Sequence, residues 1–145
     1  MKVVMVFGAF DGVHPGHVDF FRQAKEFGGL LVVSVGLDRN VEKIKGEKPL
    51  FSESERLEVI RQLKIVDNAV LGAAGDFFQH IKRFNPDVIA LGYDQWASDL
   101  MVRRELDKVG LVKTQVVRLK PYDPSRAKST IMKQKSDEFK HFAED

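Results

Sequence analysis

The chain has 145 residues, 43% hydrophobic and 30% charged, which is the size and composition of one soluble globular domain. Its 23 basic and 21 acidic side chains give a formal net charge of +2, too small to favour general binding to nucleic acid or to a membrane surface. There is no cysteine, which excludes disulfides, thiolate catalysis and cysteine-based zinc sites. No targeting segment or membrane span is recognisable, so we expect a cytoplasmic protein in which residues 1–145 form a single domain.

Apolar strands and amphipathic helices alternate along the chain. The strands are short, continuous apolar runs, as expected for a parallel sheet buried on both faces, and the helices repeat apolar residues at helical spacing. In chain order we predict strand 3–7, helix 17–28, strand 30–37, a lysine-rich loop or flap over 39–51, a helix behind the capping sequence SESE (52–55), strand 68–72, helix 76–84, strand 88–92, helix 98–109, strand 114–119 and a last helix from Ser129. We expect the final residues, 136–145, to fray.

This alternation predicts an α/β fold, a Rossmann-like, doubly wound parallel sheet of five strands with right-handed crossovers. In such sheets a ligand binds beyond the carboxyl ends of the strands, where the strand order reverses. With the order 3-2-1-4-5 the fourth strand lies beside the first. The loop GYDQ (92–95) then faces the loop GAFDGVHPGH (8–17), and two glycine-containing loops, each with an aspartate, converge.

The segment GAFDGVHPGH places His14 and His17 three positions apart, where the first strand ends and a helix begins. Glycines let backbone approach closely, and the free N–H groups at the start of a helix favour an anion such as phosphate. The runs GxxxxGK[ST] and GxGxxG are absent, which argues against a P-loop and a dinucleotide fingerprint. The histidines then have three interpretations: a metal pair, a helix cap, or two donors to phosphoryl oxygens whose charge rises in a transition state. We favour the third, which needs only positioning and charge stabilisation.

The same segment resembles the signature of the HxGH nucleotidyltransferases, the cytidylyltransferase-like superfamily, which usually reads G-T-F-D-x-x-H-x-G-H. Only Ala9 departs from it, where the family has threonine, so one polar contact is lost. The resemblance covers nearly the whole chain. It includes a flap lysine, a helix arginine, a segment before the third strand, the loop after the fourth strand and a turn before the last helix, which correspond to Lys45, Arg56, KIVD (64–67), GYD (92–94) and KST (128–130).

The resemblance implies transfer of a nucleoside monophosphate from a nucleoside triphosphate to a phosphorylated acceptor, with release of pyrophosphate. VIALGYDQ and LGAAGDFFQHIKRFNPD look most like archaeal-type FAD synthases, which transfer AMP from ATP to FMN. One alternative is a cytidylyltransferase that uses CTP and glycerol 3-phosphate, although that group usually carries G-D-D where this chain has GYD. A second alternative is a nucleotide-binding protein without catalytic activity.

Residue by residue, the resemblance implies catalytic roles for His14, His17 and Lys45, the last as a mobile cation on a flap hinged at Gly46. The positions implied to bind the nucleotide are Gly8, Ala9, Phe10, Asp11, Gly16, Arg56, Gly92, Tyr93, Asp94, Lys128, Ser129 and Thr130. Those implied to bind the acceptor are Asp11, Lys45 and Trp96. We expect Mg²⁺ to be carried by the triphosphate without direct protein ligands, and a homodimer with neither a nucleic-acid nor a membrane partner.

Several of these positions also have a purely structural interpretation. Arg56 would then be an exposed helix arginine paired with Glu53 or Glu55, and Trp96 would pack the helix that follows it. The turn at 128–130 departs from the family pattern, which has serine at Lys128 and lysine at Ile131. Positive charge for the triphosphate could come instead from Lys128, Arg118 or Arg126, and the remaining histidines, His80 and His141, are interpreted as surface or helix-face residues without a role.

Overall fold

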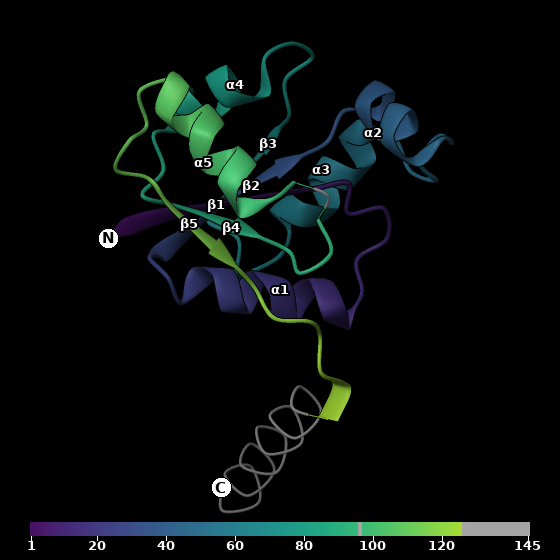
Figure 1. Cartoon of the computed structure of the whole chain (residues 1–145). Helices are drawn as coiled ribbons and strands as arrows, with labels where there is room; N and C mark the ends of the chain where they lie inside the picture. The colour runs from purple at the N-terminus through teal and green to yellow at the C-terminus, as the bar shows by residue number, and fades with distance from the viewer. Residues whose placement is uncertain (96, 126–145) are drawn as a thin grey trace, which may run out of the picture.

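A parallel sheet organises the part of the chain described by the computed structural model, residues 1–95 and 97–125. Its strands there are β1 (Lys2–Gly8), β2 (Gly29–Val35), β3 (Asn68–Leu71), β4 (Val88–Leu91) and β5 (Gln115–Arg118). They lie in the order β3-β2-β1-β4-β5, and every neighbouring pair is parallel (Figure 1). The order reverses between β1 and β4, as predicted, so the loops that follow these two strands are neighbours.

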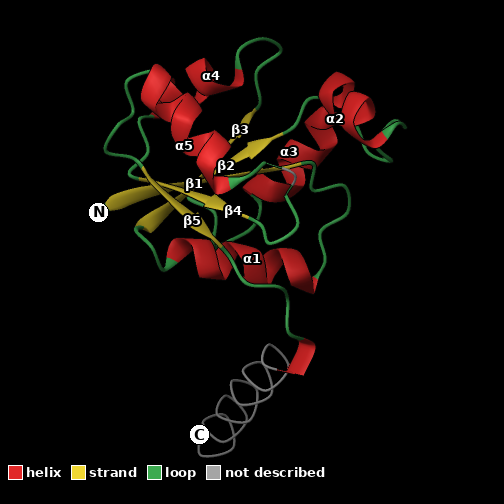
Figure 2. Ribbon diagram, viewed as in Figure 1, coloured by secondary structure: helices red, strands yellow, loops and turns green. Residues whose placement is uncertain are grey.

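Helices cover both faces of this sheet. They are α1 (Pro15–Lys25), α2 (Asp38–Lys45), α3 (Glu53–Arg61), α4 (Phe77–Phe84) and α5 (Asp99–Lys108). The helices α1 and α3 pack on one face and α4 and α5 on the other, whereas α2 lies beside α3 (Figure 2). This arrangement confirms the predicted doubly wound, Rossmann-like α/β fold. Among the helices of the described residues, none is long and apolar enough to cross a membrane.

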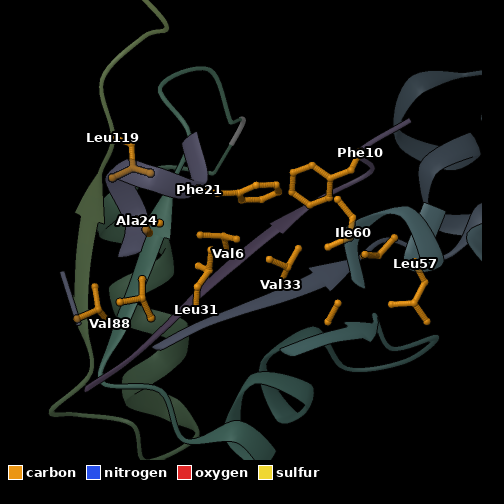
Figure 3. Packing of buried hydrophobic residues seen from close by; sticks show 14 residues of the cluster. Val6, Phe10, Phe21, Ala24, Leu31, Val33, Leu57, Ile60, Val88 and Leu119 are labelled. Atoms are coloured by element: carbon orange, nitrogen blue, oxygen red, sulfur yellow. The ribbon is translucent and has the colours of Figure 1, made fainter. Parts of the chain in front are cut away.

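The central strand β1 shows why its sequence is apolar without interruption. Val6 faces α1 and α3, where it packs in one cluster with Phe21 and Ile60 (Figure 3). Met5 and Phe7 face the opposite side and pack with α4 and α5. Because both faces are buried, the polar alternation of a half-exposed strand is absent. The loop carrying the two histidines therefore leaves a rigid strand in the middle of the core.

Two elements differ from the sequence-based prediction. Segment 39–51, predicted as a loop or flap, is helical in its first half, where it forms most of α2; the helix ends where Gly46 adopts a left-handed conformation with φ of 82°. The helix predicted over 17–28 runs instead from Pro15 to Lys25; it begins earlier because the side chain of His14 caps it.

Of the two positions expected for His80, at the surface or on a helix face, the second is correct: His80 lies on the buried face of α4. Its side chain is buried, its Nε2 lies 3.0 Å from Oγ of Ser34, and its ring packs edge-on against Phe84. Burial, helped by the charge of Arg83, lowers the pKa of His80, so the core holds a neutral imidazole. Outside the described residues lie His141, Arg126, the last helix predicted from Ser129 and the predicted fraying of 136–145.

Candidate active site

The loops after β1 and β4 meet at the carboxyl end of the sheet, and the side chain of Gln95 joins them. Its Oε1 accepts a hydrogen bond from the amide of Gly92 (2.7 Å), and its Nε2 donates to the carbonyl of Phe7 at the end of β1 (3.2 Å). The predicted proximity of the two glycine-containing loops is therefore present. The sequence analysis did not assign a role to Gln95, because nothing in a local pattern indicates a partner 88 positions away.

The first part of the β1–α1 loop is shaped by Phe10, which has a φ of 51°, unusual for a residue with a side chain. Its ring is buried in the core, 5.1 Å from the ring of Phe21 and edge-on to His17 at 5.5 Å. A Cβ on Gly8 would lie 2.7 Å from the Phe10 ring, so only glycine fits there. Gly8 and Phe10, both implied to bind nucleotide, therefore pack against each other at the base of the loop, on the side of the core.

His14 and His17 stack on one another at the start of α1, with ring centroids 3.8 Å apart. Nδ1 of His14 accepts from the amide of Gly16 (3.0 Å), and Nδ1 of His17 accepts from the amide of His14 (3.2 Å). A ring nitrogen that accepts a hydrogen bond carries no proton, so the proton of each neutral imidazole resides on Nε2. Neither Nε2 has a hydrogen-bond partner in the described part of the chain. Capping the helix with Nδ1 thus leaves two N–H donors for a ligand.

Gly16 is required by this arrangement, since a Cβ there would lie 2.8 Å from Cε1 of His14. The protonation of His17 follows from its surroundings. Burial, the neighbouring His14 and the charge of Lys45 lower the pKa of His17 to about 4. Near neutral pH His17 is therefore an uncharged donor.

Asp11 connects this loop to the flap that follows α2. Its carboxylate accepts from the amides of Leu50 (2.6 Å) and Phe51 (2.9 Å). Burial acts to raise the pKa of Asp11, but these amide donors and the charges of Arg56 and Lys45 outweigh it and hold the pKa below its usual value. Both oxygens of a residue implied to bind nucleotide and acceptor are thus engaged within the chain.

Arg56 lies beneath the same loop and is 1% exposed. Its guanidinium donates to the carbonyls of Ala9 (2.8 Å) and Phe51 (3.0 Å) and to the carboxylate of Asp38 (2.7 Å). The alternative of an exposed arginine paired with Glu53 or Glu55 was therefore wrong. Because its three acceptors belong to the β1–α1 loop, the end of the flap and the start of α2, Arg56 fixes these segments relative to one another.

Lys45 is the last residue of α2 and is exposed. Its charge makes the smallest of the contributions that lower the pKa values of Asp11 and His17, so its ammonium group is near enough to act on both. Apart from Gly46 itself and its two chain neighbours, no heavy atom of the described residues lies within 4 Å of the position that a Cβ on Gly46 would occupy. The structure therefore brings Lys45 to the same end of the sheet as the histidines. The residue that follows it, Gly46, has open space at the position of a side chain.

The loop after β4 presents Tyr93 and Asp94 to solvent, Tyr93 with 57% of its surface exposed. Both backbone groups of Gly92 are already engaged: its amide by Gln95, and its carbonyl by the Gln95 amide and the guanidinium of Arg118. Among the described residues of this loop, Tyr93 and Asp94 are therefore the ones that present exposed side chains at the turn. Trp96, Lys128, Ser129 and Thr130 lie outside the described residues.

A surface hollow of about 350 Å³ lies at the other end of the sheet, between the segments that precede β4 and β5. It is lined by Asn85, Pro86, Asp87, Gly110, Leu111, Val112, Lys113 and Thr114. None of these residues belongs to the candidate site. Because ligands of parallel sheets bind beyond the carboxyl ends of the strands, the end that carries the histidines is the better candidate for an active site than this hollow.

Comparison with known proteins identifies relatives over most of the chain. Residues 5–135 match the family model described as cytidylyltransferase-like. The FAD synthase of Ferroglobus placidus is 46% identical over 120 residues, which cover 83% of this chain and 77% of that protein. The FAD synthase of Thermoplasma acidophilum is 38% identical over 135 residues, which cover 93% of this chain and 94% of that protein.

A solved structure shows the same fold. It is named as a lipopolysaccharide core biosynthesis protein from Thermoplasma volcanium and superposes with a TM-score of 0.80 at 37% sequence identity, covering 85% of this chain and 99% of that one. Together these findings confirm the resemblance drawn from the HPGH segment and the motifs that accompany it. The chain belongs to the cytidylyltransferase-like family.

Proposed function

We propose that the protein is an FMN adenylyltransferase, an FAD synthase, which joins FMN to the AMP part of ATP. An oxygen of the FMN phosphate forms a bond to the α-phosphorus of ATP. The bond from that phosphorus to the oxygen bridging the β-phosphorus breaks, and the products are FAD and pyrophosphate. Membership of the family, and the FAD synthase names of relatives that match most of the chain, support this reaction.

The observation that carries the proposal is the pair of Nε2–H groups left by the capping of α1. Because each Nδ1 of His14 and His17 accepts from backbone, both imidazoles offer a hydrogen-bond donor to oxygens of the α-phosphate and the leaving pyrophosphate. Negative charge on these oxygens grows toward the transition state, and fixed donors that meet it there lower the barrier. No covalent intermediate is required.

Lys45 supplies positive charge from the end of α2, directly before the flap. Its position at the end of α2, beside Gly46, allows the ammonium group to approach the reacting phosphates when substrate is bound. Mg²⁺ enters this proposal as part of the nucleotide substrate, because phosphate oxygens are ligands that it prefers. Within residues 1–95 and 97–125 no group of three or more His, Asp or Glu side chains is arranged to hold a metal ion.

The decisive experiment is a substrate panel. The protein is incubated with Mg²⁺, each of the four nucleoside triphosphates, and either FMN or glycerol 3-phosphate, and pyrophosphate and the nucleotide product are measured. We expect turnover with ATP and FMN. Turnover only with CTP and glycerol 3-phosphate would establish the cytidylyltransferase alternative, and nucleotide binding without pyrophosphate release from any pair would establish a protein without catalytic activity.

The matched control for this panel is His14→Asn. Asparagine keeps a side-chain acceptor for the start of α1, but it lacks the Nε2–H group. Activity that belongs to the protein falls on the order of 10²–10³-fold in this variant, whereas activity from a contaminant is unchanged. The homodimer expected from the family resemblance is part of the same proposal and is measured by light scattering of the full chain.

A further inference from the structure

Arg118, the last residue of β5, holds the loop that follows β4. Its Nη1 donates to the carbonyls of Gly92 (2.7 Å) and Gln95 (3.3 Å), and its Nη2 donates to the carbonyl of Ala97 (2.6 Å). Nε and Nη2 also bind one carboxylate oxygen of Asp99, at 3.0 and 2.6 Å. A guanidinium has five N–H donors, and all five are used here.

This saturation decides between two roles for Arg118. A positive charge for the triphosphate was one possibility from the sequence, but a phosphate would have to displace bonds that Arg118 already makes to the loop and to Asp99. Its side chain is only 27% exposed, which further restricts access from solvent. The geometry therefore favours a structural role, in which Arg118 holds the loop after β4 in place.

The same loop is held from its other side by Gln95, whose side chain bonds to the Gly92 amide and to the carbonyl of Phe7. The Gln95 amide also donates to the carbonyl of Gly92 (3.2 Å), which closes a four-residue turn. Tyr93 and Asp94 are the two central residues of that turn, and both are exposed. The loop thus has a rigid frame and two free side chains at its tip.

We propose that Arg118 and Gln95 are positioning residues that hold this turn in its binding-competent shape, so that Tyr93 and Asp94 meet the nucleoside of the substrate already in place. This inference rests on the proposed nucleotidyltransferase function. When only a fraction of the free protein has the competent shape, the apparent dissociation constant rises by the inverse of that fraction. A loosened turn that is competent one-tenth of the time would therefore weaken nucleotide binding about tenfold.

The test compares Arg118→Lys with Arg103→Lys. Lysine keeps the positive charge but cannot bind several carbonyls in one plane. Arg103, on α5, is a matched control, because its guanidinium also binds carbonyls of a loop, those of Leu111 and Thr114, at the opposite end of the sheet. Asp99→Asn, which keeps an acceptor and removes the charge that faces Arg118, serves as the second, milder variant.

Two measurements are made on the nucleotide-free and nucleotide-bound protein. Trp96 is the only tryptophan in the sequence and directly follows Gln95 in it, so acrylamide quenching of its fluorescence gives a readout that needs no activity. Calorimetric titration with a non-hydrolysable ATP analogue gives the dissociation constant, and kcat is measured at saturating ATP with FMN.

For Arg118→Lys we expect faster quenching of Trp96 and a dissociation constant raised on the order of tenfold. The fold-decrease in kcat should be much smaller than this fold-increase in the dissociation constant, because ground state and transition state lose the same contacts. Asp99→Asn should change the quenching rate and the dissociation constant in the same direction but by less. Arg103→Lys should leave both unchanged. Unchanged quenching and affinity in Arg118→Lys would overturn the proposal. A loss of kcat with unchanged affinity would also overturn it, by placing Arg118 in the chemistry. Failure of the proposed function would give a different result. The parent protein would show no turnover, while Arg118→Lys would still change the quenching of Trp96 and the dissociation constant for the ATP analogue.

Discussion

Replacement of Arg56 by methionine tests whether this arginine serves the site by holding its loops together. Its buried guanidinium donates to the carbonyls of Ala9 and Phe51 and to Asp38. Methionine fills much of the same space without donors, so all three acceptors lose a charged partner. Removing one member of a buried ion pair costs about 3–5 kcal/mol. Asp38 is 42% exposed and can be hydrated, so we expect the free energy of unfolding to fall by about 2–4 kcal/mol.

The assay is urea unfolding of the nucleotide-free protein, followed by circular dichroism. Arg61→Met is the control, because Arg61 is an exposed residue of the same helix, and its replacement should change the free energy of unfolding by less than about 0.5 kcal/mol. Parental stability of Arg56→Met would refute the reasoning. It would mean that the guanidinium contributes little to the free protein and instead awaits a nucleotide phosphate, the role implied by the family resemblance.

The remaining predictions concern the histidines. His14→Asn and His17→Ala should each lower kcat on the order of 10²–10³-fold and change KM far less, and a variant with near-parental kcat would remove that residue from the mechanism. Titration of the His17 ring by NMR should show a midpoint near pH 4; a midpoint near 6.5 would contradict the burial seen here. Because the pKa values of His17 and His80 are lowered by folding, the unfolded chain binds protons more readily, and stability should fall as the pH drops from about 6.5 toward 4. In His80→Gln the free energy of unfolding, measured by chemical denaturation, should fall less steeply over that pH range. An unchanged slope of the free energy of unfolding against pH would exclude His80 as a cause of the pH dependence.

Local sequence determined most of the secondary structure. The continuous apolar run of β1, the helical spacing that follows it and the serine-glutamate capping box before α3 are each recognisable within a few residues. Each corresponds to an element of the structure, although α1 begins and ends earlier than predicted. The strand order followed from general rules for parallel sheets, and the segment GAFDGVHPGH indicated the family, because it resembles the family's signature at every position but Ala9.

The roles of the polar side chains around the site were decided only by the tertiary structure. Arg56 and Ala9 are separated by 47 positions and Gln95 and Phe7 by 88, so no local pattern indicates that they bind each other. The burial of His80 likewise depends on Ser34, 46 positions away on β2. Sequence periodicity reports which face of an element is apolar, but it does not report which distant backbone group a polar side chain will satisfy. The partner of each polar side chain is determined only when the strands pair, because pairing brings loops that are distant in the sequence next to one another.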